Sequence, residues 1–165
     1  MSRKLVAAVA GIAVAVVAAT ALAQTSTPPG GTLTFRELEK GSKFSFTDNP
    51  PRSKRKGEPS ASLGDDLTFS NPLADAGGSR IGTLYVRCTI VRASRLISHA
   101  TTLCHGAFSF PGKGTLTLEA LPGSLNAKSV IGAVTGGTGS FANARGTFTS
   151  TNTKTGSDDT VTFAG

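Results

Sequence analysis

The sequence contains no tryptophan and only one tyrosine, Tyr85, among its 165 residues. Proteins that bind single-stranded nucleic acid usually stack the bases on aromatic side chains. The chain offers nothing that matches such a stacking platform, although its formal net charge is +7. We therefore expect no nucleic acid among its partners.

Several common catalytic signatures are also missing. The sequence has no Gly-Lys-Ser/Thr of a phosphate-binding loop, no G-x-S-x-G turn, no H-E-x-x-H helix and no calcium-binding loop of the EF-hand type. Its two histidines, His99 and His105, are not spaced like a pair of metal ligands. These absences predict no metal site and no cofactor, and the histidines are interpreted as surface or edge residues.

Basic residues are concentrated in "PRSKRKGEP", within a long segment between Pro50 and Gly64. The four cations are Arg52, Lys54, Arg55 and Lys56. A run of this kind, flanked by proline and glycine, is typical of a solvated loop. It is also compatible with binding to an anionic polymer or to the cell envelope.

The N-terminal segment has the pattern of a secretory signal peptide. Arg3 and Lys4 precede an apolar run over residues 5–23, which ends in "ALAQ". This pattern predicts cleavage between Ala23 and Gln24 and a secreted protein without a membrane span. An uncleaved membrane anchor is the alternative, because the run nearly reaches the length of a spanning helix. Residues 24–31 are predicted to be a flexible linker, and residues 32–165 a single domain.

The only two cysteines, Cys88 and Cys104, lie in two strand-like runs joined by "RASRLISHAT". A hairpin centred near Leu96 would place the two cysteines opposite each other. Exported proteins commonly oxidise such pairs. The sequence therefore predicts one disulfide.

Helical periodicity is almost absent, and polar and apolar residues alternate instead. The alternating segments are "TLTFRELE", "KFSFT", "DDLTFS", "GTLYVRCTIVR", "TLCHGAFSF", "GTLTLEAL", "AKSVIGAV", "RGTFTSTNT" and "DTVTFAG". Short strands joined by tight turns predict an all-β fold, either a barrel or a sandwich. The short links between consecutive strands favour the antiparallel barrel.

The glycines of "VTGGTGSFANARGTF" need a separate interpretation. Gly137, Gly139 and Ala142 fit the dinucleotide-binding spacing G-x-G-x-x-A. That fingerprint requires a following helix and a further strand with an acid about 20 residues on. Two threonine-rich strands follow here instead. We therefore interpret the glycines as a tight connection that allows positive φ angles and close backbone packing.

Two stretches resemble a known superfamily. "SLGDDLTFSNPLADAGGSRIGTLYVRCTIVR" (residues 62–92) and "AVTGGTGSFANARGTF" (residues 133–148) are similar to the plant allene oxide cyclases and the dirigent proteins. The resemblance is stronger still to bacterial secreted proteins with an allene oxide cyclase-like barrel, and it covers residues 31–165. It implies an eight-stranded antiparallel β-barrel with an apolar lumen, often a homotrimer. Allene oxide cyclases close a fatty-acid epoxide without a cofactor, and dirigent proteins direct the coupling of phenolic radicals.

The same resemblance suggests site residues. Asn71 matches a pocket asparagine and Glu37 a pocket glutamate, which makes these two the candidate catalytic residues. Phe69 matches an aromatic wall, Cys88 a pocket cysteine, and Arg145 an arginine near the pocket of dirigent proteins. These three are the candidate ligand-binding residues.

The strand pattern supports the assignment of Glu37 independently. Glu37 shares a strand face with Leu33 and Phe35, so burial would raise the pKa of its carboxyl group. A register misjudged by one residue would place it in water instead. The acidic pairs Asp65/Asp66 and Asp158/Asp159 lie beside strand starts, where turn-forming and solvated roles are expected.

Two functions follow as hypotheses. The first is a secreted barrel that binds a small hydrophobic or phenolic ligand in its lumen and directs its cyclisation or coupling. The alternative is a non-catalytic exported module that contacts the cell envelope or an anionic polymer through the basic segment. The sequence leaves open whether the chain is an enzyme; if it is, a cofactor-independent cyclase or isomerase is implied.

Overall fold

The computed structural model describes residues 30–50 and 61–165. The predicted signal peptide and the four cations of the basic segment lie outside the described residues. Within these ranges, no helix is long and apolar enough to cross a membrane.

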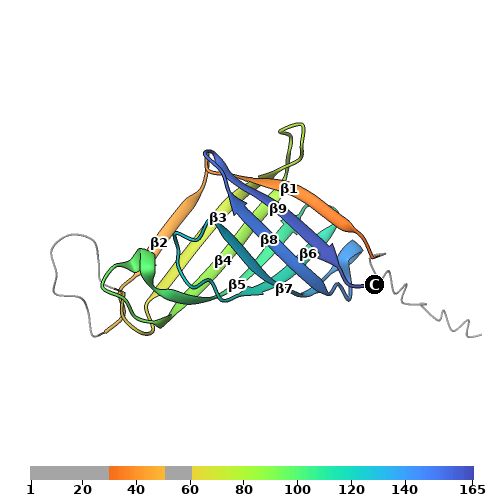
Figure 1. Ribbon diagram of the computed structural model, residues 1–165. Coiled ribbons are helices and arrows are strands. Elements are labelled where there is room, and N and C mark those ends of the chain that lie inside the picture. The colour runs from red at the N-terminus through yellow and green to blue at the C-terminus, as the bar shows by residue number, and fades with distance from the viewer. Residues whose placement is uncertain (1–29, 51–60) are drawn as a thin grey trace, which may run out of the picture.

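The described chain is built almost entirely of β-strands, with two single-turn 3₁₀ helices. The 3₁₀ helices are η1 (Ile97–His99) and η2 (Gly139–Phe141), which lie at opposite ends of the molecule in Figure 1. The strands are β1 (Thr32–Leu38), β2 (Lys43–Thr47), β3 (Asp66–Ala74), β4 (Arg80–Arg92), β5 (Thr101–Phe110), β6 (Gly114–Ala120), β7 (Ser129–Gly137), β8 (Gly146–Asn152) and β9 (Gly156–Phe163).

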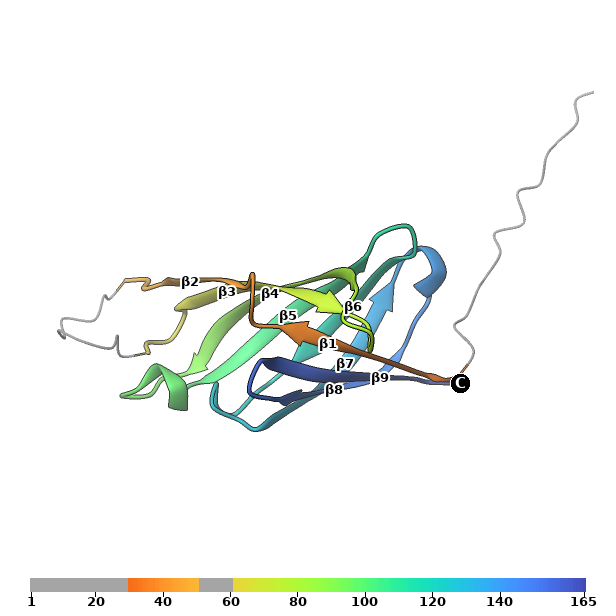
Figure 2. The ribbon, with the colours of Figure 1, turned by 90° about the horizontal axis from the view of Figure 1, so that it is seen from above.

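The strands form one antiparallel sheet that closes on itself. From β3 to β9 each strand pairs with the next along the chain, and β1 pairs with β9 on one side and with β3 on the other. Strands β1 and β2 share one edge of β3. β1 pairs with the C-terminal end of β3, and β2 pairs with its N-terminal half. The strand pairing thus defines a closed eight-stranded barrel with one extra strand. Figures 1 and 2 show how the strands are arranged in two views. Closure confirms the predicted barrel and excludes the sandwich.

The seam between β1 and β3 is short. Only Arg36 opposite Ala74 and Glu37 opposite Leu73 are paired there. After β1 the chain turns through Gly41, whose φ of 92° is in the left-handed region, and continues as β2. The barrel therefore closes at the position of Glu37.

Phenylalanine side chains fill the interior at one end of the barrel. Phe35 and Phe108 meet edge to face, with ring centroids 4.7 Å apart. Phe110 bridges from Phe35, at 5.5 Å, to Phe141 of η2, at 5.4 Å. Aromatic pairs at these separations stabilise a core beyond the burial of their area. This half of the barrel is solid.

The glycine-rich connection lies at the solid end, between β7 and β8. Gly139 has a φ of 60°, a conformation in which a side chain is strained. A Cβ atom at this position would also collide with the backbone of Lys113. The predicted tight connection is confirmed, because these two constraints require glycine.

The cysteine hairpin also forms as predicted. Cys88 on β4 and Cys104 on β5 are register partners, and they are joined by a disulfide. The pairing places Leu96 midway along the connection between the two strands. Both sulfur atoms belong to the inner face of the barrel.

Candidate functional site

A cavity of about 360 Å³ occupies the lumen at the end away from the glycine-rich connection. Its floor is formed by Phe108 and Phe148, whose rings lie edge to face with centroids 6.2 Å apart. The lumen is therefore neither empty along its whole length nor completely filled. A cavity of this size falls within the range of small-molecule binding sites.

One wall of the cavity is apolar. Strands β3 to β8 contribute the side chains of Leu67, Phe69, Leu84, Val86, Leu118, Ala120, Val130 and Phe148. The disulfide between Cys88 and Cys104 belongs to this wall. A bridged cysteine presents no thiol, so Cys88 contributes an apolar surface to the cavity.

The opposite wall is polar and comes from strands that lie on both sides of the seam. Its residues are Glu37, Asn71, Ser150, Asn152 and Ser157. Glu37 of β1 is paired with Ser157 of β9, which is paired in turn with Asn152 of β8. Inward positions of three adjacent strands thus form one polar row across an otherwise apolar lumen.

Glu37 is the buried carboxyl group of this wall, with 7% of its surface exposed. Asn71 donates a hydrogen bond from Nδ2 to Oε2 of Glu37, at 2.5 Å. Burial raises the pKa of Glu37, and the hydrogen bond from Asn71 partly opposes that rise. The predicted strand face of Glu37 is confirmed, and the alternative register that would expose it is wrong.

A second carboxyl group, Asp159, lies behind this wall. Asp159 is 2% exposed and stands opposite Phe35 on one side and Ser150 on the other. Neither of its carboxyl oxygens makes a hydrogen bond with an N–H or O–H group of the described residues. Burial and the nearby charge of Glu37 raise the pKa of Asp159 to about 8.

The position of Asp159 corrects the prediction that both aspartates of this pair are solvated. Asp158 does face water and forms an ion pair with Arg36 on the outside of the barrel, at 3.2 Å. Asp159 is the next residue in β9, so its side chain points to the other face. The signal was present in the sequence, because Asp159 alternates with the apolar Val161 and Phe163.

In the other acidic pair, Asp65 has the predicted turn-forming role, although it is buried and not solvated. Asp65 accepts hydrogen bonds from the backbone N–H groups of Asn49 and Ser62, at 2.9 and 2.8 Å, and thereby fixes a turn. Asp66 forms an ion pair with Arg87 on the outer face, at 2.8 Å. Neither residue contributes to the cavity.

The mouth of the cavity is covered by the connection between β6 and β7. Pro122, Ser124, Leu125 and Ala127 line the cavity from this segment. Ser124 donates a hydrogen bond from Oγ to the carbonyl of Ser98, at 2.7 Å. Asn152 holds the other end of the segment by donating to the carbonyl of Ala127, at 2.8 Å. These bonds fix the entrance at both ends.

The described residues that line the cavity include no lysine, arginine or histidine. Glu37 is the sole ionisable side chain among them, since the two cysteines are bridged. The described chain also holds no cluster of three potential metal ligands. The cavity is therefore suited to a molecule that is mostly apolar.

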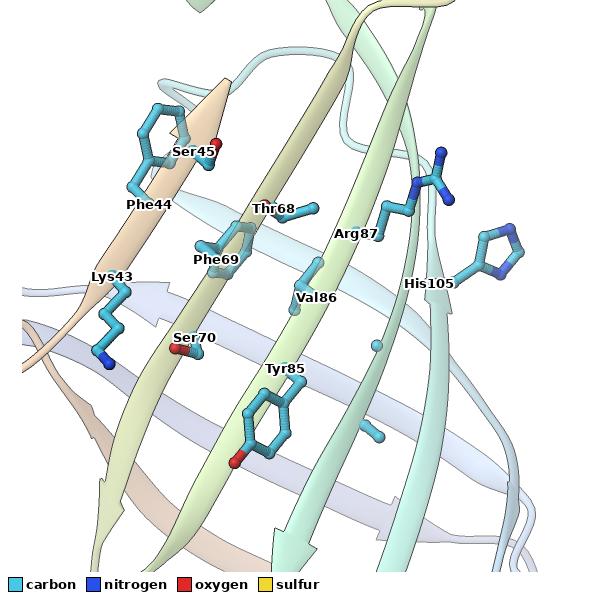
Figure 3. A pocket seen from close by; sticks show the side chains of 12 residues that line it. Lys43, Phe44, Ser45, Thr68, Phe69, Ser70, Tyr85, Val86, Arg87 and His105 are labelled. Carbon is cyan, nitrogen blue, oxygen red and sulfur yellow. The ribbon is translucent and has the colours of Figure 1, made fainter. Parts of the chain in front are cut away.

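A wider and more open depression of about 620 Å³ crosses β2 to β5. Figure 3 shows Lys43, Tyr85, Arg87 and His105 projecting from neighbouring strands along it. Arg87 is already paired with Asp66, and His105 lies 3.5 Å from a carboxylate oxygen of Glu119. Because this depression is open to solvent and two of its polar side chains are already paired, the less open lumen is the better candidate site.

The structure brings together four of the five residues that the resemblance suggested. Glu37, Asn71, Phe69 and Cys88 all line the cavity. Arg145 does not join them: it is exposed and donates a hydrogen bond from Nη1 to the carbonyl of Ala144, at 2.7 Å. Asp159 is the one buried carboxyl next to the site that the sequence analysis missed.

Comparison of the sequence with protein-family profiles and with curated protein sequences finds no match. Solved structures do match. A protein described as pyocyanin demethylase is 20% identical, with a TM-score of 0.64 over 81% of this chain and 100% of that one. The pterocarpan synthase dirigent protein PsPTS1 is also 20% identical, with a TM-score of 0.55 over 81% of this chain and 90% of that one.

A third match is the Diels–Alderase AbmU from Streptomyces koyangensis. It is 17% identical, with a TM-score of 0.52 over 87% of this chain and 74% of that one. At these identities the matches establish the architecture and not the activity. The chain therefore shares the antiparallel barrel fold of these proteins, which include a dirigent protein and a Diels–Alderase.

Proposed function

We propose that this protein is an exported barrel that binds a small hydrophobic or phenolic molecule in its lumen and directs its cyclisation or coupling. The observation that carries the proposal is the cavity of about 360 Å³ in the lumen, in which a buried carboxyl–carboxamide pair faces an apolar wall. Two of the similar structures, a dirigent protein and a Diels–Alderase, support the same class of chemistry.

The residues of the cavity suit this role for two reasons. A rigid apolar wall restricts the conformations of a bound molecule, which lowers the entropic cost of bringing two of its atoms together. Glu37, oriented by Asn71, supplies a carboxyl group that accepts a hydrogen bond or a proton from the ligand. No step of this scheme requires a cofactor.

Occupation of the lumen can be tested by filling it. Ala120 lines the cavity, whereas Ala133 lies on the outer face of the neighbouring strand β7. We expect Ala120→Phe to weaken binding of the neutral fluorescent probe N-phenyl-1-naphthylamine at least about tenfold, because the added ring occupies the site. The matched variant Ala133→Phe should bind the probe as the wild type does.

A milder change at the entrance provides a second variant, in case Ala120→Phe does not fold. Leu125 is 36% exposed at the mouth of the cavity, so Leu125→Trp narrows the entrance without altering the core. Equal probe binding by wild type, Ala120→Phe and Leu125→Trp would overturn the lumen as the binding site. Native mass spectrometry of the exported full-length chain would then show whether a small molecule is carried at all.

A further inference from the structure

Glu37 and Asp159 form an isolated pair of carboxyl groups inside the barrel. They project inward from adjacent strands, because Glu37 is paired with Ser157 and Asp159 lies two residues further along β9. Diagonal neighbours of this kind lie within reach of each other's side chains. Glu37 lines the cavity and Asp159 does not, so Asp159 stands behind Glu37 as seen by a ligand.

Among the residues that the structure describes, no cation lies close enough to neutralise the pair. Arg36 and Asp158, on the same two strands, point outward and pair with each other. Glu39 and Lys40, which follow β1, are exposed, and β8 contributes only the uncharged Ser150 on this side. On β3 the neighbouring side chain is the amide of Asn71, and the one acid of that strand, Asp66, is paired outside with Arg87.

Two ionised carboxylates cannot be accommodated side by side in a buried site without a cation. Asn71 donates to Glu37, which favours the charged form of Glu37. The oxygens of Asp159 have no donor at hydrogen-bonding distance among the described residues, and the nearby hydroxyl of Ser150 opposes the rise of its pKa only in part. A single proton placed on Asp159 and directed at Glu37 satisfies both groups.

We propose that Glu37 and Asp159 share one proton, held by Asp159, so that the lumen presents one hydrogen-bond-accepting carboxylate and selects uncharged hydroxyl-bearing ligands over anionic ones. Asp159 is then a positioning residue that acts through Glu37. The ligand part of this inference rests on the proposed function, because it assumes that the lumen is the binding site.

The selection follows from the charge of the site. An anionic ligand would bring a second negative charge into a cavity whose described lining includes no cation. A neutral hydroxyl group can instead donate a hydrogen bond to Glu37, and bonds to charged acceptors are the stronger ones. The structure thus favours a phenol or an alcohol over a free fatty acid.

The shared proton can be tested without a ligand. The full-length protein labelled with ¹³C at the Asp and Glu carboxyl carbons is titrated by NMR. We expect the signal of Asp159 to remain that of a carboxylic acid at neutral pH and to titrate at lower pH in Glu37→Gln, where the neighbouring charge is removed. An Asp159 signal that titrates in the ordinary acidic range in the wild type would overturn the shared proton.

Ligand selection is measured with three probes of one skeleton: 1-naphthol, 1-naphthoate and naphthalene. We expect the wild type at pH 7 to bind 1-naphthol at least about tenfold more tightly than 1-naphthoate. In the Glu37→Gln variant, the cavity has no carboxylate to repel an anion. The preference for 1-naphthol over 1-naphthoate should therefore become smaller. Asp159→Asn keeps an N–H donor toward Glu37 and cannot ionise, so the preference should persist and should not change as the pH rises through 8.

The outcomes separate this inference from the proposed function. If naphthalene binds and 1-naphthol shows no advantage over 1-naphthoate, the lumen is a binding site and the selection is overturned. If no probe binds, the ligand part is overturned together with the proposed function. In both cases the carboxyl titration still decides whether the pair shares a proton.

Discussion

Asn71 donates a hydrogen bond to Glu37 at the seam where the barrel closes. The two residues are 34 positions apart in the sequence, and they meet because β1 pairs with β3 next to Glu37. The bond therefore links strand closure to the orientation of the carboxyl group in the lumen. A change at either residue should affect both stability and binding.

Replacement of Asn71 by alanine tests this link. The Asn71→Ala variant should lower the free energy of unfolding by about 1–3 kcal/mol, because the buried Glu37 loses a donor. It should also raise the pKa of Glu37, since the bond from Asn71 lowers that pKa in the wild type. Denaturant unfolding and carboxyl NMR measure the two effects.

Ser70→Ala is the matched control, because Ser70 is the neighbouring residue of β3 on the outer face and lines only the open depression. It should change stability by no more than about 0.5 kcal/mol. If Asn71→Ala were as stable as this control and left the pKa of Glu37 unchanged, the hydrogen bond would have no role in orienting the carboxyl group.

The pH dependence of stability should carry the signature of Asp159. Its pKa is raised from 3.8 to about 8 in the folded state, so the contribution of this group is complete below pH 3.8 and is lost as the pH rises through 8. Between these limits the unfolded chain has released a proton that the folded chain keeps. The free energy of unfolding should therefore fall by about 1.4 kcal/mol per pH unit from this group.

Urea unfolding at pH 5, 6 and 7 measures this slope. The Asp159→Asn variant should lack the contribution, because an amide does not titrate. Asp158→Asn removes the adjacent exposed carboxyl group on the outer face and should retain it. A slope that is identical in the wild type and in Asp159→Asn would mean that Asp159 is ionised in the folded protein.

The disulfide between Cys88 and Cys104 closes a loop with a sequence separation of 16. Its removal by the double change to alanine should lower the free energy of unfolding by about 3 kcal/mol, because the unfolded chain gains conformational freedom. The mass of the oxidised wild type should be lower by two hydrogens than that of the reduced protein. Equal stability of the oxidised and reduced forms would contradict this account.

Gly156 lies at the start of β9, directly against the backbone of Glu37. Its φ is 147°, and a Cβ atom there would collide with the carbonyl oxygen of Glu37. Gly156→Ala should therefore cost on the order of 1–3 kcal/mol of stability and weaken probe binding by displacing Glu37. Thermal unfolding and probe titration measure both consequences.

The control for this variant is Gly123→Ala. Gly123 has open space where its Cβ atom would lie, and its φ is not in the left-handed region. This change should leave both stability and binding within error of the wild type. A Gly156→Ala variant that behaves in the same way would show that β9 can move away from Glu37 without loss.

Much of the fold could be predicted because its signals are local. The alternation of Leu33, Phe35 and Glu37 fixed one strand face, and the symmetric spacing of Cys88 and Cys104 about Leu96 fixed one hairpin register. The glycines around Gly139 indicated a turn that only a residue without a side chain can make. Each of these inferences depends on neighbours within one or two strands.

The resemblance placed Glu37, Asn71, Phe69 and Cys88 in one pocket, and all four line the cavity. The resemblance also suggested Arg145 as a pocket residue, but Arg145 is exposed and does not line the cavity. An arginine that follows a turn can point to either face of the sheet, and its sequence context alone does not decide which.

Only the tertiary structure decided what surrounds the carboxyl groups. Asp159 and Glu37 are 122 residues apart, and they become neighbours because the last strand of the barrel pairs with the first. Likewise, the phenylalanines that fill one half of the lumen come from strands at both ends of the chain. The sequence determined which residues face inward, through the period of two along each strand. Closure of the sheet determined which inward residues meet, because that pairing is set between strands distant in the chain.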